Sequence, residues 1–111
     1  MAQRVDMREP FKRVSVDEAQ KLIAEGIQIV DVRTPAEYGN GHIPDARSVP
    51  LDSVLARPRD LLKGDRILFV CQVGQRSALA AEMAAAVGIS EVFNLEGGTD
   101  AWVRAGNGVV R

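Results

Sequence analysis

The chain of 111 residues has few of the residues on which several classes of protein depend. It contains one cysteine, Cys71, and one histidine, His42. A single cysteine forms no internal disulfide, and this pair is too small a set of ligands for a structural zinc site. A catalytic triad that includes histidine would have to use His42. We therefore expect neither a disulfide framework nor a bound metal.

Long apolar runs and an excess of one charge are also missing. The formal net charge is −1, from 14 basic and 15 acidic residues, so charge gives no argument for a nucleic-acid partner. No stretch approaches the roughly 20 apolar residues that span a bilayer. Residues 1–12 lack the apolar centre of a signal peptide. These absences predict a cytoplasmic protein with a reduced thiol and no membrane partner.

The residues that are present suffice for one globular domain. Hydrophobic residues make up 46% and charged residues 26%, which is ordinary for such a domain. A chain of this length can bury about two-thirds of its unfolded surface. We predict a flexible, charged leader at residues 1–10 and one domain over residues 11–111. A monomer is the simplest expectation.

Strand-like and helix-like segments alternate along this domain. The expected strands are 27–32, 48–49, 67–70 and 91–95, and the expected helices follow Ser15 and Thr34 or occupy 51–62, 77–87 and 99–105. The run 67–70 is wholly apolar, as in a strand that is buried on both faces. This alternation predicts a parallel α/β sheet that is covered by helices on both sides.

Capping signals mark two of the helix starts. Ser15 with Glu18 has the pattern of a capping box, and Thr34 is an N-cap followed by Pro35 at the first helical position. Pro58 should break the segment 51–62.

The single cysteine lies where the apolar strand ends and a helix is about to begin. Ligands of open parallel sheets bind outside the carboxyl ends of the strands. A helix start also offers unpaired N–H groups and the positive end of the helix dipole. A thiol with a pKa of about 8.5 is only about 3% thiolate at pH 7, and a drop of about two units makes it mostly thiolate. We therefore expect Cys71 to have a lowered pKa.

The residues after the cysteine support a binding site for an anion. Gly74 permits the positive φ with which successive N–H groups turn inward as a nest. Arg76 adds a fixed charge, and Ser77 is placed to cap the helix. The alternative is that Cys71 is a small buried hydrophobic residue and Gly74 an ordinary turn glycine. The combination Cys-x-x-Gly-x-Arg-Ser favours an anion-binding nucleophile.

Four segments together resemble the rhodanese (sulfurtransferase) family in its small single-domain form. They are Ile29 to Tyr38, Gly41 to Ala46, Cys71 to Ser77, and Leu95 to Gly98 with Trp102 and Gly106. Their order and spacing match the family pattern from about residue 13 onward. The resemblance implies a single α/β domain with a central parallel five-stranded sheet and helices on both faces.

The resemblance also implies a reaction. Cys71 would take a sulfane sulfur from a donor such as thiosulfate, become a persulfide, and pass the sulfur to cyanide or a thiol. Cys71 and Arg76 are the implied catalytic residues, and the implied substrate-binding residues are Gln72, Val73, Gly74, Gln75 and Ser77. No metal or organic cofactor is needed. The implied partners are a small sulfur-containing anion or thiol, or a protein persulfide.

Two other functions remain open at this point. Cysteine phosphatases that share this fold use Cys-x5-Arg, whereas four residues separate Cys71 from Arg76. The shorter loop makes a tighter cradle, and Val70 stands before the cysteine in place of histidine. Both details favour sulfur transfer over a phosphatase or an arsenate-reductase-like enzyme. The second alternative is a non-catalytic rhodanese module that binds a protein partner.

Five further positions have structural interpretations. Arg33 should pair with Asp31 or Glu37. The alternative is that its positive charge helps to attract an anionic substrate to Cys71. His42 should shape the turn 41–44, with a Cys–His dyad as the alternative. Gly97 and Gly98 should permit close approach of the backbone near the site, and Trp102 should lie in the core: these are predictions from turn-forming residues and side-chain size.

Overall fold

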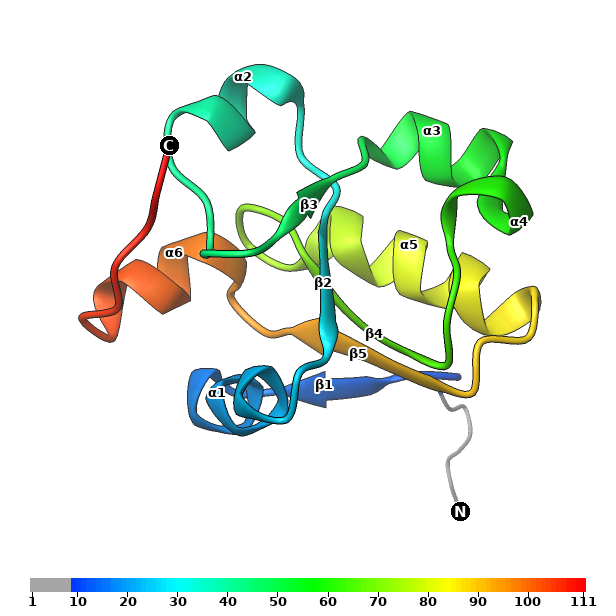
Figure 1. Cartoon of the computed structure of the whole chain (residues 1–111), viewed down its shortest axis with the longest axis horizontal. Coiled ribbons are helices and arrows are strands. Elements are labelled where there is room, and N and C mark those ends of the chain that lie inside the picture. Colours follow the sequence, from blue (N-terminus) through cyan, green and yellow to red (C-terminus); the bar gives the residue numbers. More distant parts are fainter. Residues whose placement is uncertain (1–8) are drawn as a thin grey trace, which may run out of the picture.

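Five parallel strands form the sheet at the centre of the molecule (Figure 1). The computed structural model describes residues 9–111. The strands are β1 (Lys12–Val14), β2 (Gln28–Asp31), β3 (Arg47–Ser48), β4 (Arg66–Val70) and β5 (Glu91–Leu95). Their order in the sheet is β1-β5-β4-β2-β3, and every pairing is parallel. The predicted parallel α/β sheet is confirmed.

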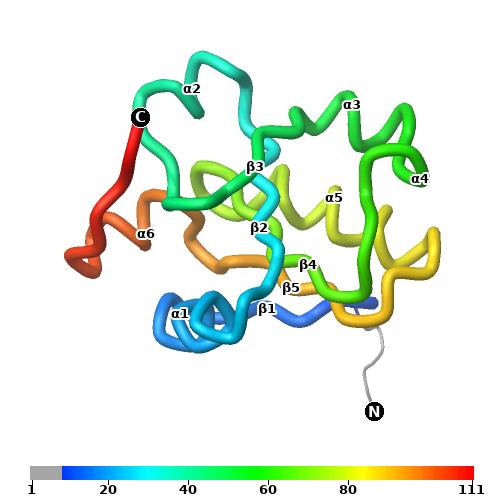
Figure 2. Tube along the Cα trace, in the orientation of Figure 1, coloured from blue at the N-terminus to red at the C-terminus, as the bar shows by residue number. Residues whose placement is uncertain are grey.

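Helices cover both faces of this sheet (Figure 2). They are α1 (Val16–Ala24), α2 (Pro35–Gly39), α3 (Leu51–Ala56), α4 (Pro58–Leu61), α5 (Gln75–Ala86) and α6 (Gly98–Arg104). One core cluster joins the sheet to α3 and α5, and the other joins it to α1 and α6. In the part of the chain that the structure describes, no helix has the length and apolar character needed to cross a membrane.

The capping signals are confirmed. The Ser15 side chain accepts from Glu18 N–H and the Glu18 carboxylate accepts from Ser15 N–H. The same reciprocal box joins Thr34 and Glu37 at the start of α2. The segment 51–62 is broken before Pro58, which begins the separate helix α4.

One strand was not predicted. β1 has three residues and pairs only with β5, at the edge of the sheet. Two apolar residues, Phe11 just before the strand and Val14 at its end, are too few to establish a period of two. The position of β1 is therefore set by pairing with β5 rather than by its own pattern. The predicted leader covers residues 1–10, and residues 1–8 of it lie outside the described residues.

Strand β4 is the best buried part of the sheet and determines where the site lies. Residues 67–70 have no exposed surface, because neighbouring strands flank β4 and helices pack on both of its faces. The strands run in the same direction, so the carboxyl ends of β2, β4 and β5 meet at one edge (Figure 1). The first residue after β4 at this edge is Cys71.

Candidate active site

The Cys71 sulfur lies in a tight loop between β4 and α5. Cys71 is only 1% exposed. The Gly74 N–H donates to its Sγ at 3.1 Å, and the Ser77 Oγ lies 3.3 Å from the same atom. Gly74 has the predicted positive φ, 99°, and a Cβ there would lie 3.3 Å from the Gly97 N atom. Both the backbone angle and the limited space favour glycine at this position.

Opposing effects act on the Cys71 thiol. Burial raises the pKa of this thiol. Hydrogen bonds from the Ser77 hydroxyl and from the backbone N–H groups of Ser77, Gly74 and Val73 lower it by more, so the pKa lies below its usual value. The sulfur also lies at the N-terminus of α5, whose first turn has no acidic residue. The expected direction of the shift is thus confirmed.

Ser77 does not have the capping role that we predicted. The helix begins earlier than expected, at Gln75, with Gly74 as its N-cap and no side-chain cap. Ser77 therefore lies inside the first turn and is fully buried. Its hydroxyl contacts the Cys71 sulfur on one side and the Asn94 Oδ1 atom, at 2.5 Å, on the other.

Arg76 forms an ion pair with a residue of α2. Its Nη1 and Nη2 atoms donate to the two carboxylate oxygens of Glu37 at 2.7 and 2.9 Å. The hydrogen bonds from Arg76 lower the pKa of Glu37 to about 2, with backbone N–H donation from Thr34 as a further cause. The positive charge of the loop is therefore partly neutralised. Glu37 was considered in the sequence only as a partner of Arg33.

Arg33 forms a buried network instead. It is 3% exposed, and its guanidinium donates to both carboxylate oxygens of Asp31, with Nη2 at 2.8 Å from Oδ2. It also donates to the Gly41 carbonyl and to the Gln72 Oε1 atom. Pairing with Asp31, one of the two expected partners, is confirmed.

The remaining loop residues have different environments. The Gln72 side chain accepts from Arg33 and donates to the Asp100 carboxylate, so it is held between β2 and α6. Val73, 53% exposed, and Gln75 face the surface. Of the predicted substrate-binding side chains, only that of Ser77 reaches the sulfur; Gly74 and Val73 act through backbone N–H groups.

The start of α6 packs against the backbone of the loop at Cys71 and Gln72. Thr99 donates to the Cys71 carbonyl twice, from its N–H at 2.8 Å and from its hydroxyl at 3.1 Å. A Cβ on Gly98 would collide with the Cys71 carbonyl oxygen and lie 2.6 Å from the Gln72 carbonyl carbon. The predicted close approach at this glycine is confirmed.

The contacts of His42 are structural. Its ring stacks on Tyr38 with centroids 3.7 Å apart, and its Nδ1 atom lies 2.9 Å from the Tyr38 carbonyl oxygen. Its backbone pairs with Val110. This agrees with a role in shaping the turn. Trp102 is buried in the core, also as predicted.

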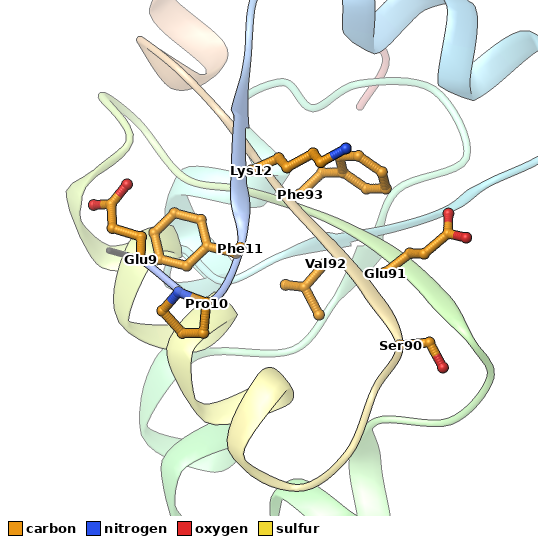
Figure 3. A pocket seen from close by; sticks show the side chains of 8 residues that line it. All are labelled: Glu9, Pro10, Phe11, Lys12, Ser90, Glu91, Val92 and Phe93. Carbon is orange, nitrogen blue, oxygen red and sulfur yellow. The ribbon is translucent and has the colours of Figure 1, made fainter. Parts of the chain in front are cut away.

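A pocket of about 460 Å³ opens beside the loop. It is lined by Arg33, Glu37, Asn40, Gly41, Gln72, Thr99, Asp100, Val103, Arg104 and Val109. A second pocket, of about 560 Å³, lies around β1 and the start of β5 (Figure 3). That second pocket lies at the amino ends of the strands, whereas Cys71 follows the carboxyl end of β4, and the pocket shares no residue with the loop. Within residues 9–111, no group of three or more His, Cys, Asp or Glu side chains is placed to hold a metal ion.

Sequence reasoning missed three polar residues around the loop: Asn94, Thr99 and Asp100. Asn94 had a detectable signal, because an amide in the otherwise apolar run 92–95 must find buried partners. Thr99 and Asp100 were assigned only to a helix. Their contacts with Cys71 and Gln72 depend on how α6 packs, which their own sequence does not state.

The fold and this loop define a class of protein, and comparison with known proteins gives the family. Residues 15–105 match the model of the rhodanese-like domain. A sulfurtransferase of Allochromatium vinosum is 37% identical over 86 residues, which cover 78% of this chain and 80% of the relative. The thiosulfate sulfurtransferase GlpE of Pseudomonas entomophila is 37% identical over 92 residues, which cover 83% and 84%.

A solved structure agrees with these sequence matches. The crystal structure of a rhodanese-like domain protein from Staphylococcus aureus has a TM-score of 0.75 and 36% identity, over 90% of this chain and 97% of that one. The chain belongs to the rhodanese-like family.

Proposed function

We propose that this protein is a sulfurtransferase that moves a sulfane sulfur from a donor such as thiosulfate to cyanide or a thiol through a Cys71 persulfide. The observation that carries this proposal is the placement of the sulfur: it faces the Gly74 N–H at 3.1 Å and the Ser77 hydroxyl at 3.3 Å, at the start of α5. Relatives that are named sulfurtransferase and thiosulfate sulfurtransferase support the class of reaction.

In the first half-reaction, the Cys71 thiolate attacks the outer sulfur of thiosulfate. A new S–S bond forms at Cys71 Sγ, the S–S bond of the donor breaks, and sulfite leaves with the electron pair. The lowered pKa of Cys71 increases the fraction of the nucleophilic thiolate at a given pH. N–H groups of the loop can then hold the negative charge of the terminal persulfide sulfur.

In the second half-reaction, an acceptor thiolate or cyanide attacks the terminal sulfur of the persulfide. The S–S bond to Cys71 breaks and its electron pair returns to Sγ. The acceptor leaves as a persulfide or as thiocyanate. The donors that stabilised the thiolate before the reaction stabilise it again as the leaving group, which lowers the barrier to this second step.

The geometry of Arg76 bears on the choice of donor. Its guanidinium is engaged by Glu37, so it offers a dianion such as thiosulfate less attraction than a free cation would. A protein persulfide or a small thiol persulfide, which carries less charge, is therefore the alternative donor. The neutral side chains of Gln72 and Gln75 support the same alternative.

The test is intact mass under non-reducing conditions. The wild type and Cys71→Ala are incubated separately with thiosulfate, with 3-mercaptopyruvate and with a thiol persulfide. The wild type should gain one sulfur atom, lose it to cyanide or a thiol, and release thiocyanate or a persulfide in equal amount. Cys71→Ala should gain none.

The other outcomes identify other functions. Hydrolysis of p-nitrophenyl phosphate that is lost in Cys71→Ala, without gain of sulfur, would support a phosphatase. A thiol that gains no sulfur from any donor and titrates at its ordinary pKa would support a non-catalytic binding module.

A further inference from the structure

Asn94 occupies a fully buried position on β5, behind the sulfur. Its Nδ2 atom donates to the Gly74 carbonyl at 3.1 Å. A carbonyl oxygen can only accept, so this contact fixes which end of the amide is nitrogen. The Oδ1 atom must therefore be the end that lies 2.5 Å from the Ser77 Oγ. Since Oδ1 also can only accept, Ser77 is the donor in that hydrogen bond.

The Ser77 hydroxyl has one hydrogen and two acceptors that can take it. One is the Asn94 Oδ1 atom, and the other is the Cys71 Sγ atom at 3.3 Å. When Cys71 is a thiol, its S–H can donate to Ser77, and Ser77 can donate to Asn94. When Cys71 is a thiolate, the hydrogen is needed at the sulfur, and the Asn94 oxygen is left facing the lone pairs of Ser77. The two acceptors compete for one hydrogen.

We propose that Asn94 is a positioning residue that holds the Ser77 hydroxyl hydrogen while the Cys71 sulfur is uncharged and releases it when the sulfur becomes a thiolate. Asn94 acts through Ser77 and contacts no substrate in this scheme. The inference deepens the proposed function and rests on it only in taking Cys71 as the reacting group.

This arrangement suits a sulfur whose charge appears and disappears in one turnover. In the persulfide, Sγ is neutral and bridging, so the Ser77 hydrogen returns to Asn94. As the acceptor removes the outer sulfur, charge develops on Sγ and the hydrogen turns back toward it. A buried hydroxyl would otherwise lack an acceptor in the persulfide state, and an unsatisfied buried polar group is unfavourable. Asn94 thus supplies the acceptor for this hydroxyl in the persulfide state, and the Cys71 sulfur supplies it in the thiolate state.

The charged groups near Cys71 are paired in ways that substitution of Asn94 leaves in place. Arg76 of α5 is paired with Glu37 of α2. At the end of β2, Arg33 is paired with Asp31. On α6, the Asp100 carboxylate accepts from Gln72. None of these side chains is hydrogen-bonded to Asn94, whose side-chain hydrogen bonds join it to Ser77 and Gly74.

The test is the thiol pKa, measured from the pH dependence of alkylation by iodoacetamide in the absence of any sulfur donor. Asn94→Ala removes the competing acceptor, so the Ser77 hydrogen should stay at the sulfur. The pKa of Cys71 should fall by about half a unit to one unit, as expected for one hydrogen bond. Ser77→Ala removes the donor and should raise it by a similar amount. Asn94→Ala in the Ser77→Ala background should cause no further change.

The sign of the shift separates the proposal from a merely structural role. If Asn94 only supports the loop through Gly74, its loss would weaken the N–H donation to sulfur and raise the pKa. A raised pKa in Asn94→Ala, or an equal shift with and without Ser77, would overturn the proposal. Circular dichroism confirms that each variant is folded. A lowered pKa in a protein that gains no sulfur would refute the proposed function and leave the role of Asn94 intact.

Discussion

The ends of β2 and β4 lie side by side in the sheet, yet they handle charge in opposite ways. At the end of β2, the full charges of Arg33 and Asp31 are buried against each other. At the end of β4, the Cys71 sulfur is surrounded by neutral N–H and O–H donors. A permanent charge can be neutralised by a permanent partner. A charge that appears only during part of a reaction is better stabilised by dipoles, which need no counter-charge when it is absent.

The largest expected effect is on stability, at the end of β2. Arg33→Met keeps much of the side-chain volume but leaves Asp31 buried without its partner, which should lower the free energy of unfolding by about 3–5 kcal/mol. Arg76→Met is the matched control, because its ion pair with Glu37 is about one-third exposed and should contribute about 1 kcal/mol or less. Urea unfolding measures both. Equal losses would mean that the two arginines have the same structural role.

The next effect concerns the support beneath the sulfur. Gly98→Ala places a methyl group against the Cys71 carbonyl and Gln72 and should displace the loop, so sulfur transfer should fall by about tenfold to a hundredfold. Gly88→Ala is the control: its φ is also positive, 97°, but a Cβ there meets nothing within 4 Å. It should lose about 1–2 kcal/mol of stability from backbone strain. Steady-state kinetics of both variants test this, and a similar loss of activity in Gly88→Ala would contradict the role of the close approach.

These contrasts show which features were predictable from sequence. Cys71 and Gly74 carry local signals: an apolar strand before them, a helix after them, and a glycine where the turn needs positive φ. The capping boxes at Ser15 and Thr34 are likewise contained within four residues. Each such feature depends on neighbours in the sequence, so the pattern could predict it.

The features that could not be predicted depend on packing between distant segments. Glu37 reaches Arg76 across 39 positions, and Ser77 reaches Asn94 across 17. The expectation that Ser77 caps its helix was wrong because the helix starts two residues before it, at Gln75, with Gly74 as its N-cap. The strand β1 was missed because pairing with the distant strand β5 stabilises it, and its own three residues carry no strand pattern.

A smaller effect concerns the exposed charge at the site. Glu37→Gln keeps an oxygen that can accept from Thr34 but removes the negative charge that neutralises Arg76, whose own charge acts on Cys71. The kcat/KM for thiosulfate should rise by about threefold to fivefold, as a surface ion pair of about 1 kcal/mol allows. The gain should shrink with added salt. Glu91→Gln, which breaks the exposed pair with Arg66, should change nothing. No gain, or one that salt leaves unaltered, would place Arg76 outside the reach of the donor.

The smallest expected effect is the dependence of stability on acid at the same pair. The pKa of Glu37 is about 2 in the folded protein, below its ordinary value of 4.5. A lowered pKa contributes stability that is present above the higher value and is lost as pH falls through the lower one. The free energy of unfolding, obtained from thermal melts, should therefore be higher for the wild type than for Glu37→Gln at neutral pH, by about 1 kcal/mol or less. The difference should decline from pH 4.5 toward pH 2. A constant difference over this range would mean that the Glu37 charge does not stabilise the fold, and that the pair serves to restrain Arg76.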